Sequence, residues 1–137
     1  MFTYVYYRGI AMSKEIKRLP DAELEVMLIV WEAKPPVTAG YILERLKDRS
    51  WSLQTLFTVL TRLEGKGFLS CEKQGRSKRY YPSIDADSYK QLESQSFLER
   101  LYNNSFKNMI ASLVDSKALD QEDIRELRDY LNQLEER

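Results

Sequence analysis

Three short segments in the first half of the chain repeat apolar residues at the spacing of an α-helix, and a charged hairpin pattern comes after them. The apolar positions recur at i, i+3, i+4 and i+7, so each segment has one face that must be buried. These positions are Leu24, Met27, Leu28 and Trp31; Ala39, Ile42, Leu43 and Leu46; and Leu56, Val59, Leu60 and Leu63. Residues 68–73 and 78–83 alternate as two strands around a Gly-containing turn. The order helix, helix, helix, hairpin predicts a winged helix-turn-helix.

Polar residues and helix breakers set the ends of these predicted helices. Asp21, Thr38 and Ser52 precede the apolar stripes and are expected to cap the helix N-termini. Pro35-Pro36 closes the first helix, and Gly65 lies at the end of the third. The third helix is therefore expected to begin at Ser52, which is also counted among the residues expected to contact DNA.

Residues 84–137 are predicted to be helical throughout, with Ser105 and Asp120 as the caps of the last two helices. These helices carry apolar stripes but too few residues to build an independent core. A second copy of the same chain is the simplest partner for them. The residues expected at this homodimer interface are Phe97, Leu98, Leu101, Phe106, Met109, Ile110, Leu113, Ile124, Leu127, Leu131 and Leu134.

The predicted fold class is mainly α with a small β-hairpin wing, in two domains. Residues 13–83 form the winged-helix DNA-binding domain, and residues 84–137 form a helical dimerisation domain. The first residues, MFTYVYYRGIA, differ in character from the rest of the chain. We expect residues 1–12 to be an upstream extension, non-native or disordered, with Met12 as the natural start.

The residue content excludes several classes of site. The chain has no histidine and one cysteine, Cys71, so the usual zinc ligands and the Ser-His and Cys-His catalytic pairs are missing. We predict no metal and no cofactor. Acidic residues such as Glu23 and Asp120 lie at helix starts, where capping explains them, and no phosphate-binding loop is present. The chain is therefore not expected to be an enzyme. A single cysteine and no apolar run of about 20 residues indicate a cytoplasmic protein.

A net charge of zero conceals an uneven distribution of charge. Residues 45–79 hold 9 basic and 3 acidic residues, whereas residues 84–137 hold 7 basic and 12 acidic residues. A basic module joined to an acidic one is typical of a phosphate-facing head and a solvated tail. The uneven charge therefore favours a phosphate-bearing partner for the first module; the alternative is a chance unevenness of charge.

The third helix offers side chains suited to reading bases. In a helix-turn-helix the N-terminal turns of the second helix of the motif lie in the major groove. Gln54, Thr55 and Thr58 point away from the leucine stripe, and Arg62 lies one turn later. Gln pairs bidentately with adenine, and Thr bonds a base or contacts a thymine methyl. The alternative is an ordinary solvated helix face.

Cations crowd the predicted hairpin and favour the DNA-binding interpretation. Lys73, Arg76, Lys78 and Arg79 lie close together near its turn, where phosphate contacts of a wing fall; the alternative is an ordinary solvated turn. The sequence leaves two alternative roles for each of two aromatic residues in or next to the third helix. Trp51 either covers the core or places its indole N–H on a phosphate, and Phe57 either packs on a neighbouring helix or contacts a thymine methyl.

Several short motifs resemble the penicillinase-repressor (BlaI/MecI) family from about Leu19 to near the C-terminus. The matching stretches are Leu24-Glu25-Val26-Met27, Val30-Trp31-Glu32, Trp51-Ser52-x-x-Thr55, Thr58-x-Leu60-x-Arg62-Leu63, Lys66-Gly67-Phe68 and Tyr80-Tyr81-Pro82. The resemblance implies a dimeric winged-helix repressor of antibiotic-resistance or cell-wall-stress genes that binds a near-palindromic operator. It also implies inactivation by proteolysis, triggered by a membrane sensor-protease.

The chain departs from the family pattern at several positions. Leu53-Gln54 stands where the family usually has Pro-Lys, and Phe57 stands where it usually has Arg, so two cations are missing from the reading helix. The family's cleaved Asn-Phe bond corresponds here to Ser96-Phe97. The missing cations leave one alternative function open, a winged-helix module that binds protein without specific DNA readout.

Overall fold

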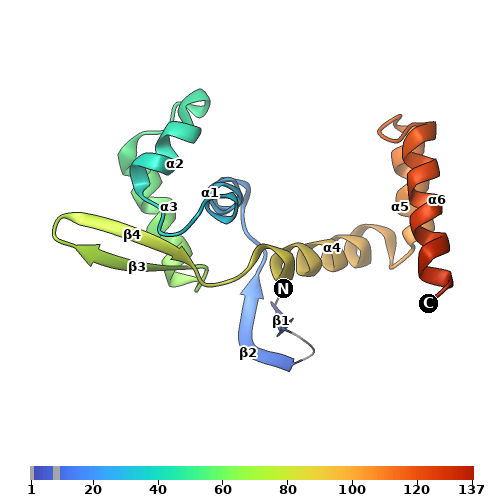
Figure 1. The fold of residues 1–137 in the computed structure, drawn as a ribbon, viewed down its shortest axis with the longest axis horizontal. Coiled ribbons are helices and arrows are strands. Elements are labelled where there is room, and N and C mark those ends of the chain that lie inside the picture. The colour runs from blue at the N-terminus through green and yellow to red at the C-terminus, as the bar shows by residue number, and fades with distance from the viewer. Residues whose placement is uncertain (1, 8–9) are drawn as a thin grey trace. The chain divides into compact units, whose positions relative to one another are not determined.

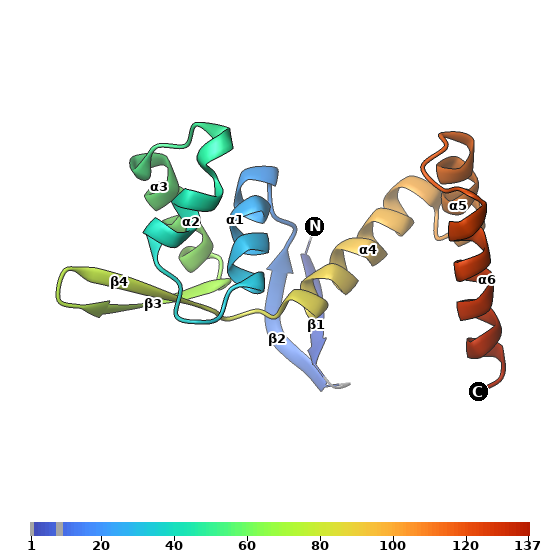
Figure 2. The ribbon, with the colours of Figure 1, turned by 45° about the horizontal axis from the view of Figure 1, so that its top comes forward.

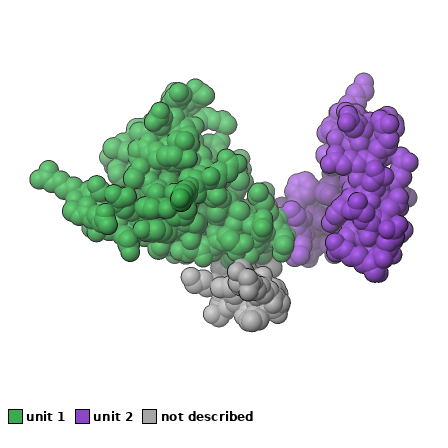
Figure 3. Space-filling model, in the orientation of Figure 1, with its two compact units in different colours: residues 1–93 green, residues 94–137 purple. Residues whose placement is uncertain are grey.

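The computed structural model describes residues 2–7 and 10–137, and it divides the chain into two compact units. Unit 1 comprises residues 1–93 and unit 2 comprises residues 94–137 (Figure 3). Across the described residues, no helix combines the length and the apolar character that a membrane span requires.

Unit 1 contains three helices and a hairpin in the predicted order (Figure 1). The helices are α1 (Asp21–Glu32), α2 (Ala39–Arg45) and α3 (Leu53–Gly65), with a 3-10 turn, η1 (Lys47–Arg49), between the last two. The hairpin consists of β3 (Leu69–Gln74) and β4 (Ser77–Pro82), which pair antiparallel. The predicted fold class, mainly α with a β-hairpin wing, is confirmed.

The apolar faces of these elements meet in one core. Figure 2 shows α1, α2 and α3 gathered beside the β3–β4 hairpin. Val37, just before α2, exchanges two backbone hydrogen bonds with Tyr80 of β4, with N–O distances of 2.9 and 2.8 Å, so the hairpin is tied to the helices. Tyr80 is buried and Tyr81 is not, as expected for alternating strand residues. Burial raises the pKa of Tyr80 to about 12, which keeps its phenol neutral in the core.

The predicted caps are correct for α2 and α3 and wrong for α1. The hydroxyls of Thr38 and Ser52 accept the backbone N–H groups of Tyr41 and Thr55. In α1 the N-cap is Pro20, which has no side-chain acceptor, and Asp21 is the first helical residue. The prediction failed because Asp21 can serve either as a cap or as an acidic residue of the first turn, where it also stabilises the helix.

A buried ion pair joins the start of α1 to the end of α3. The Nζ of Lys66 lies 2.6 Å from Oε1 of Glu23, whose side chain is only 6% exposed. Glu23 is the one charged residue among the buried residues that the structure describes. The pair fixes the two helices against each other at the edge of the core.

The fourth helix, α4 (Ala86–Tyr102), crosses the boundary between the two units. Its first two turns belong to the core of unit 1, where Tyr89 is buried. The Tyr89 hydroxyl accepts the Leu19 N–H at 2.8 Å, and its ring packs against Trp31 and Phe68 with centroid distances of 5.5 and 5.6 Å. Burial raises the pKa of Tyr89 to about 12. The core of unit 1 therefore continues to Leu92, past the domain boundary that the sequence predicts after residue 83.

Unit 2 contains the rest of α4 together with α5 (Phe106–Asp115) and α6 (Gln121–Glu135). Ser105 caps α5 and Asp120 caps α6, both as predicted. Asp120 and Asp123 form a reciprocal capping box, and the Asp123 N–H bond holds the pKa of Asp120 below its ordinary value. Neither α5 nor α6 contains a buried residue.

Two strands that the sequence did not predict precede α1. Strand β1 (Phe2–Tyr7) pairs antiparallel with β2 (Ile10–Lys17), and Ile16 of β2 is part of the core of unit 1. Met1, Arg8 and Gly9 of the predicted extension lie outside the described residues. That translation starts at Met12 stays a prediction.

Candidate nucleic-acid interface

Helix α3 divides into a buried face and an exposed polar face. Its four core residues are at most 5% exposed: Leu56, Val59, Leu60 and Leu63. The side chains predicted to read DNA all lie on the exposed face, as expected from the 3.6-residue period: Gln54, Thr55, Thr58 and Arg62. The structure therefore brings the four predicted reading residues together on one surface of unit 1.

Hydroxyl groups at the start of α3 are partly engaged by the helix itself. Ser52 Oγ accepts the Thr55 N–H at 3.0 Å and lies 2.9 Å from Thr55 Oγ1. Thr58 Oγ1 donates to the Gln54 carbonyl oxygen at 3.1 Å. Within the described part of the chain, the side chains of Gln54 and Arg62 form no hydrogen bond or ion pair. Gln54 and Arg62 are therefore the side chains most available to a partner.

The strand register separates the cations of the wing. Lys78 lies on the same side of β4 as Tyr80, which faces the helices, whereas Arg79 pairs across the ladder with Glu72 on the other side. Arg76 lies in the turn between the strands. Successive strand residues point to opposite faces, so Lys78 and Arg79 lie on opposite faces of the hairpin, and their contacts with DNA stay a prediction. Lys73, the cross-strand partner of Lys78, lies on the same face as Lys78.

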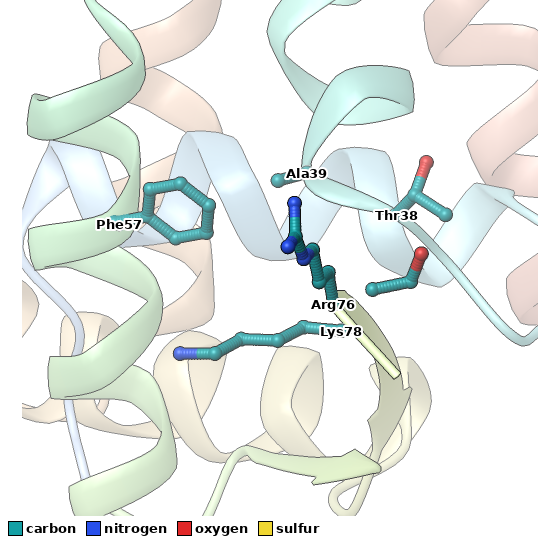
Figure 4. Close-up of a pocket in the computed structure, with 6 residues that line it drawn as sticks. Thr38, Ala39, Phe57, Arg76 and Lys78 are labelled. Atoms are coloured by element: carbon teal, nitrogen blue, oxygen red, sulfur yellow. The ribbon is translucent and has the colours of Figure 1, made fainter. Parts of the chain in front are cut away.

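An open pocket of about 310 Å³ lies between the wing tip and the helices (Figure 4). Its lining residues are Thr38, Ala39, Phe57, Arg76, Ser77 and Lys78. The Nζ of Lys78 lies 5.7 Å from the centroid of the Phe57 ring. The sequence alone leaves Phe57 between two roles and does not link it to the wing, because the two are brought together only by the tertiary fold.

Trp51 is also among the predicted DNA contacts. It is half-buried just before α3 and packs against the core cluster. Its indole therefore covers part of the core, which is one of the two roles left open by the sequence.

The described residues contain no group of three or more His, Cys, Asp or Glu side chains arranged to hold a metal ion.

The residues predicted for dimerisation form unburied stripes on unit 2. The exposed side chains include Phe97, Leu101, Phe106, Leu113, Leu131 and Leu134. The other predicted interface residues are half-buried: Leu98, Met109, Ile110, Ile124 and Leu127. The predicted cleavage bond, Ser96-Phe97, lies within α4, and the Ser96 hydroxyl accepts a bond from Arg100 Nε at 3.2 Å.

Comparison with known proteins agrees with the motifs. The sequence model of the penicillinase repressor family matches residues 19–133. The penicillinase repressor of Bacillus licheniformis is 38% identical over 120 residues, which cover 88% of this chain and 94% of that protein. The methicillin resistance regulatory protein MecI of Mammaliicoccus sciuri is 33% identical over 122 residues, 88% of this chain and 98% of that protein.

Solved structures similar to the chain include the solution structure of the DNA-binding domain of the repressor BlaI. It is 39% identical, covers 56% of this chain and 93% of its own, and has a TM-score of 0.48. The family match and the two relatives each span most of the sequence. The chain belongs to the penicillinase repressor family.

Proposed function

We propose that the chain is a dimeric, sequence-specific DNA-binding repressor of antibiotic-resistance or cell-wall-stress genes, released by proteolysis. Its relatives are named as repressors and as a regulator of methicillin resistance, and the family is one of repressors rather than enzymes. The observation that carries the DNA-binding role is the exposed polar face of α3 beside the cations of the wing.

In this proposal α3 enters the major groove with its N-terminal turns against the base edges. Gln54 is exposed in the first turn and pairs with an adenine, while Thr55 and Thr58 contact bases through their free lone pairs or methyl groups. Arg62, one turn later, reaches a phosphate or a guanine. Arg76 and Lys78 of the wing bind backbone phosphates beside the groove, which sets the register of the helix without reading sequence.

A binding titration with DNA from upstream of the chain's own gene tests this role. We expect the full chain to bind that duplex at least about 10³-fold more tightly than a random-sequence duplex at the same salt concentration. A random-sequence duplex of equal length is the control, because it keeps the phosphate contacts and loses the base contacts. Equal affinity for both duplexes would reject sequence-specific readout.

The unburied stripes of unit 2 support dimerisation. The last three helices carry exposed apolar side chains, and a second copy of the chain has stripes of the same kind to place against them. Two linked heads then bind half-sites about one helical turn or a multiple apart, so the operator is a near-palindrome.

Release by cleavage fits the position of the Ser96-Phe97 bond. A cut there would leave unit 1, the DNA-binding head, with its core residues Tyr89 and Leu92. It would remove every apolar stripe after Ser96. Because the bond lies inside α4, that helix must open locally before a protease can bind its backbone in an extended form. A membrane sensor-protease is the proposed source of the cut.

We expect cells exposed to a cell-wall antibiotic to accumulate a fragment that ends near Ser96. Immunoblots with antibodies against the head, taken before and after exposure, measure this change. If the repressor stays at full length while its target genes are induced, release occurs by another route.

A further inference from the structure

The pocket between α3 and the wing brings an aromatic ring and two cations together. Figure 4 shows the Phe57 ring beside the side chains of Arg76 and Lys78, which extend into the pocket from the hairpin. Thr38 and Ser77 add hydroxyl groups to the lining. A pocket of about 310 Å³ lies at the lower end of the size range of ligand sites.

The Phe57 ring lies where it can hold the Lys78 ammonium group. The distance of 5.7 Å from Nζ to the ring centroid is within the range of a cation–π contact, about 6 Å. Phe57 is itself half-buried and packs against the core, so its ring is a fixed surface rather than a mobile one. Lys78 would otherwise be a long, flexible chain on an exposed strand end.

The positive charges in this pocket favour binding of an anion. Lys78 pairs across the ladder with Lys73, a like charge, and Arg76 lies two residues away. Among the described residues, neither Arg76 nor Lys78 forms an ion pair with a carboxylate. Two cations beside an apolar ring and two hydroxyls match a phosphodiester joined to a sugar: the sugar has an apolar face, and the phosphate accepts charge-assisted hydrogen bonds.

We propose that Phe57 is a positioning residue that holds Lys78 at the mouth of this pocket, and that the pocket binds one sugar-phosphate unit of the DNA backbone. This inference rests on the proposed DNA-binding function and adds to it a coupling between α3 and the wing. The helix that reads the bases then also fixes the cation that binds the phosphate. Arg79, on the other face of the hairpin, takes no part in this site.

The salt dependence of binding to a random-sequence duplex tests the proposal with the full chain. Each phosphate contact contributes a slope of about 0.9 to the plot of log affinity against log salt concentration. We expect Phe57→Leu, which keeps an apolar side chain without a π face, to lower this slope by up to about one unit and to weaken binding about two- to five-fold. Phe57→Tyr, which retains the ring, is expected to restore both values.

Lysine variants separate positioning by Phe57 from a general loss of stability. Lys78→Ala should lower the slope by about one unit, and adding Phe57→Leu to it should have no further effect. Arg79→Ala is the matched control: it removes a cation from the opposite face of the same hairpin, outside the pocket, so its effect should add to that of Phe57→Leu.

Two results would overturn the proposal: an unchanged slope in Phe57→Leu, or effects of Phe57→Leu and Lys78→Ala that simply add. Either would still leave tight, sequence-specific binding by the wild-type chain intact. Failure of the proposed function itself would be recognised separately, because the wild-type chain would then not prefer its own upstream DNA.

Discussion

A chain that ends at Glu93 will fold, sediment as a monomer, and bind its operator about 10²–10⁴-fold more weakly than the full chain. The buried hydrophobic residues that the structure describes all lie between Ile16 and Leu92, so this truncation keeps the whole core of the head. It removes the exposed stripes of α5 and α6 and thus the surface proposed for dimerisation. Each head must then bind its half-site without the effective concentration that a linked partner provides.

A chain that ends at Pro82 is compared with this truncation, because it also removes the part of α4 that belongs to the core. It would lose Ile84, Tyr89 and Leu92 from the core, together with the hydrogen bond from Leu19 to the Tyr89 hydroxyl. We expect it to be largely unfolded, because deleting several buried side chains costs more than the stability of a small domain. Circular dichroism measures the folding of both chains, and analytical ultracentrifugation measures their mass. A full-length chain that sediments as a monomer at micromolar concentration would contradict the dimer.

Replacing Lys66 by methionine will lower the free energy of unfolding by about 3 kcal/mol. The Glu23 carboxylate is almost fully buried and loses its partner at 2.6 Å, whereas methionine preserves most of the apolar bulk of the lysine. The expected loss is at the low end for a broken buried pair because the Lys66 side chain is 28% exposed. Denaturant unfolding of the two proteins measures the difference.

Two further variants show whether the cost comes from the unpaired charge. Glu23→Gln combined with Lys66→Met should recover most of the lost stability, since no uncompensated charge remains buried. Lys73→Met removes an exposed lysine from the hairpin and should change stability by no more than about 0.5 kcal/mol. Equal losses in Lys66→Met and Lys73→Met would show that the ion pair contributes nothing.

The parts of the fold that depend on local sequence were predictable. Thr38, Ser52, Ser105 and Asp120 cap helices as expected, because a cap needs only a short polar side chain and the backbone three residues later. The division of α3 into a leucine face and a polar face follows from its period alone.

The parts that depend on distant contacts were not predictable in the same way. Glu23 and Lys66 are 43 residues apart, and no local rule links them. The sequence pattern places Tyr89 with the C-terminal helices, although its ring and hydroxyl complete the core of the head. The pairing of Phe57 with Lys78 likewise exists only once the hairpin has folded back beside α3.

The separation of Lys78 from Arg79 is a different case, because the two-residue period of a strand already implies it. The strands before α1 escape prediction because their segment differs in character from the helical head, although Ile16 near its end is a core residue.

The base preference of Gln54→Ala, measured against the wild-type chain, tests most directly whether α3 reads DNA. Competition titrations against all single-base variants of the operator give the discrimination at each position. We expect wild-type discrimination of about 1–3 kcal/mol at one position in each half-site, and its loss at that position alone in Gln54→Ala. If Gln54→Ala retains both the affinity and the preference of the wild-type chain at every position, the exposed face of α3 does not read the operator.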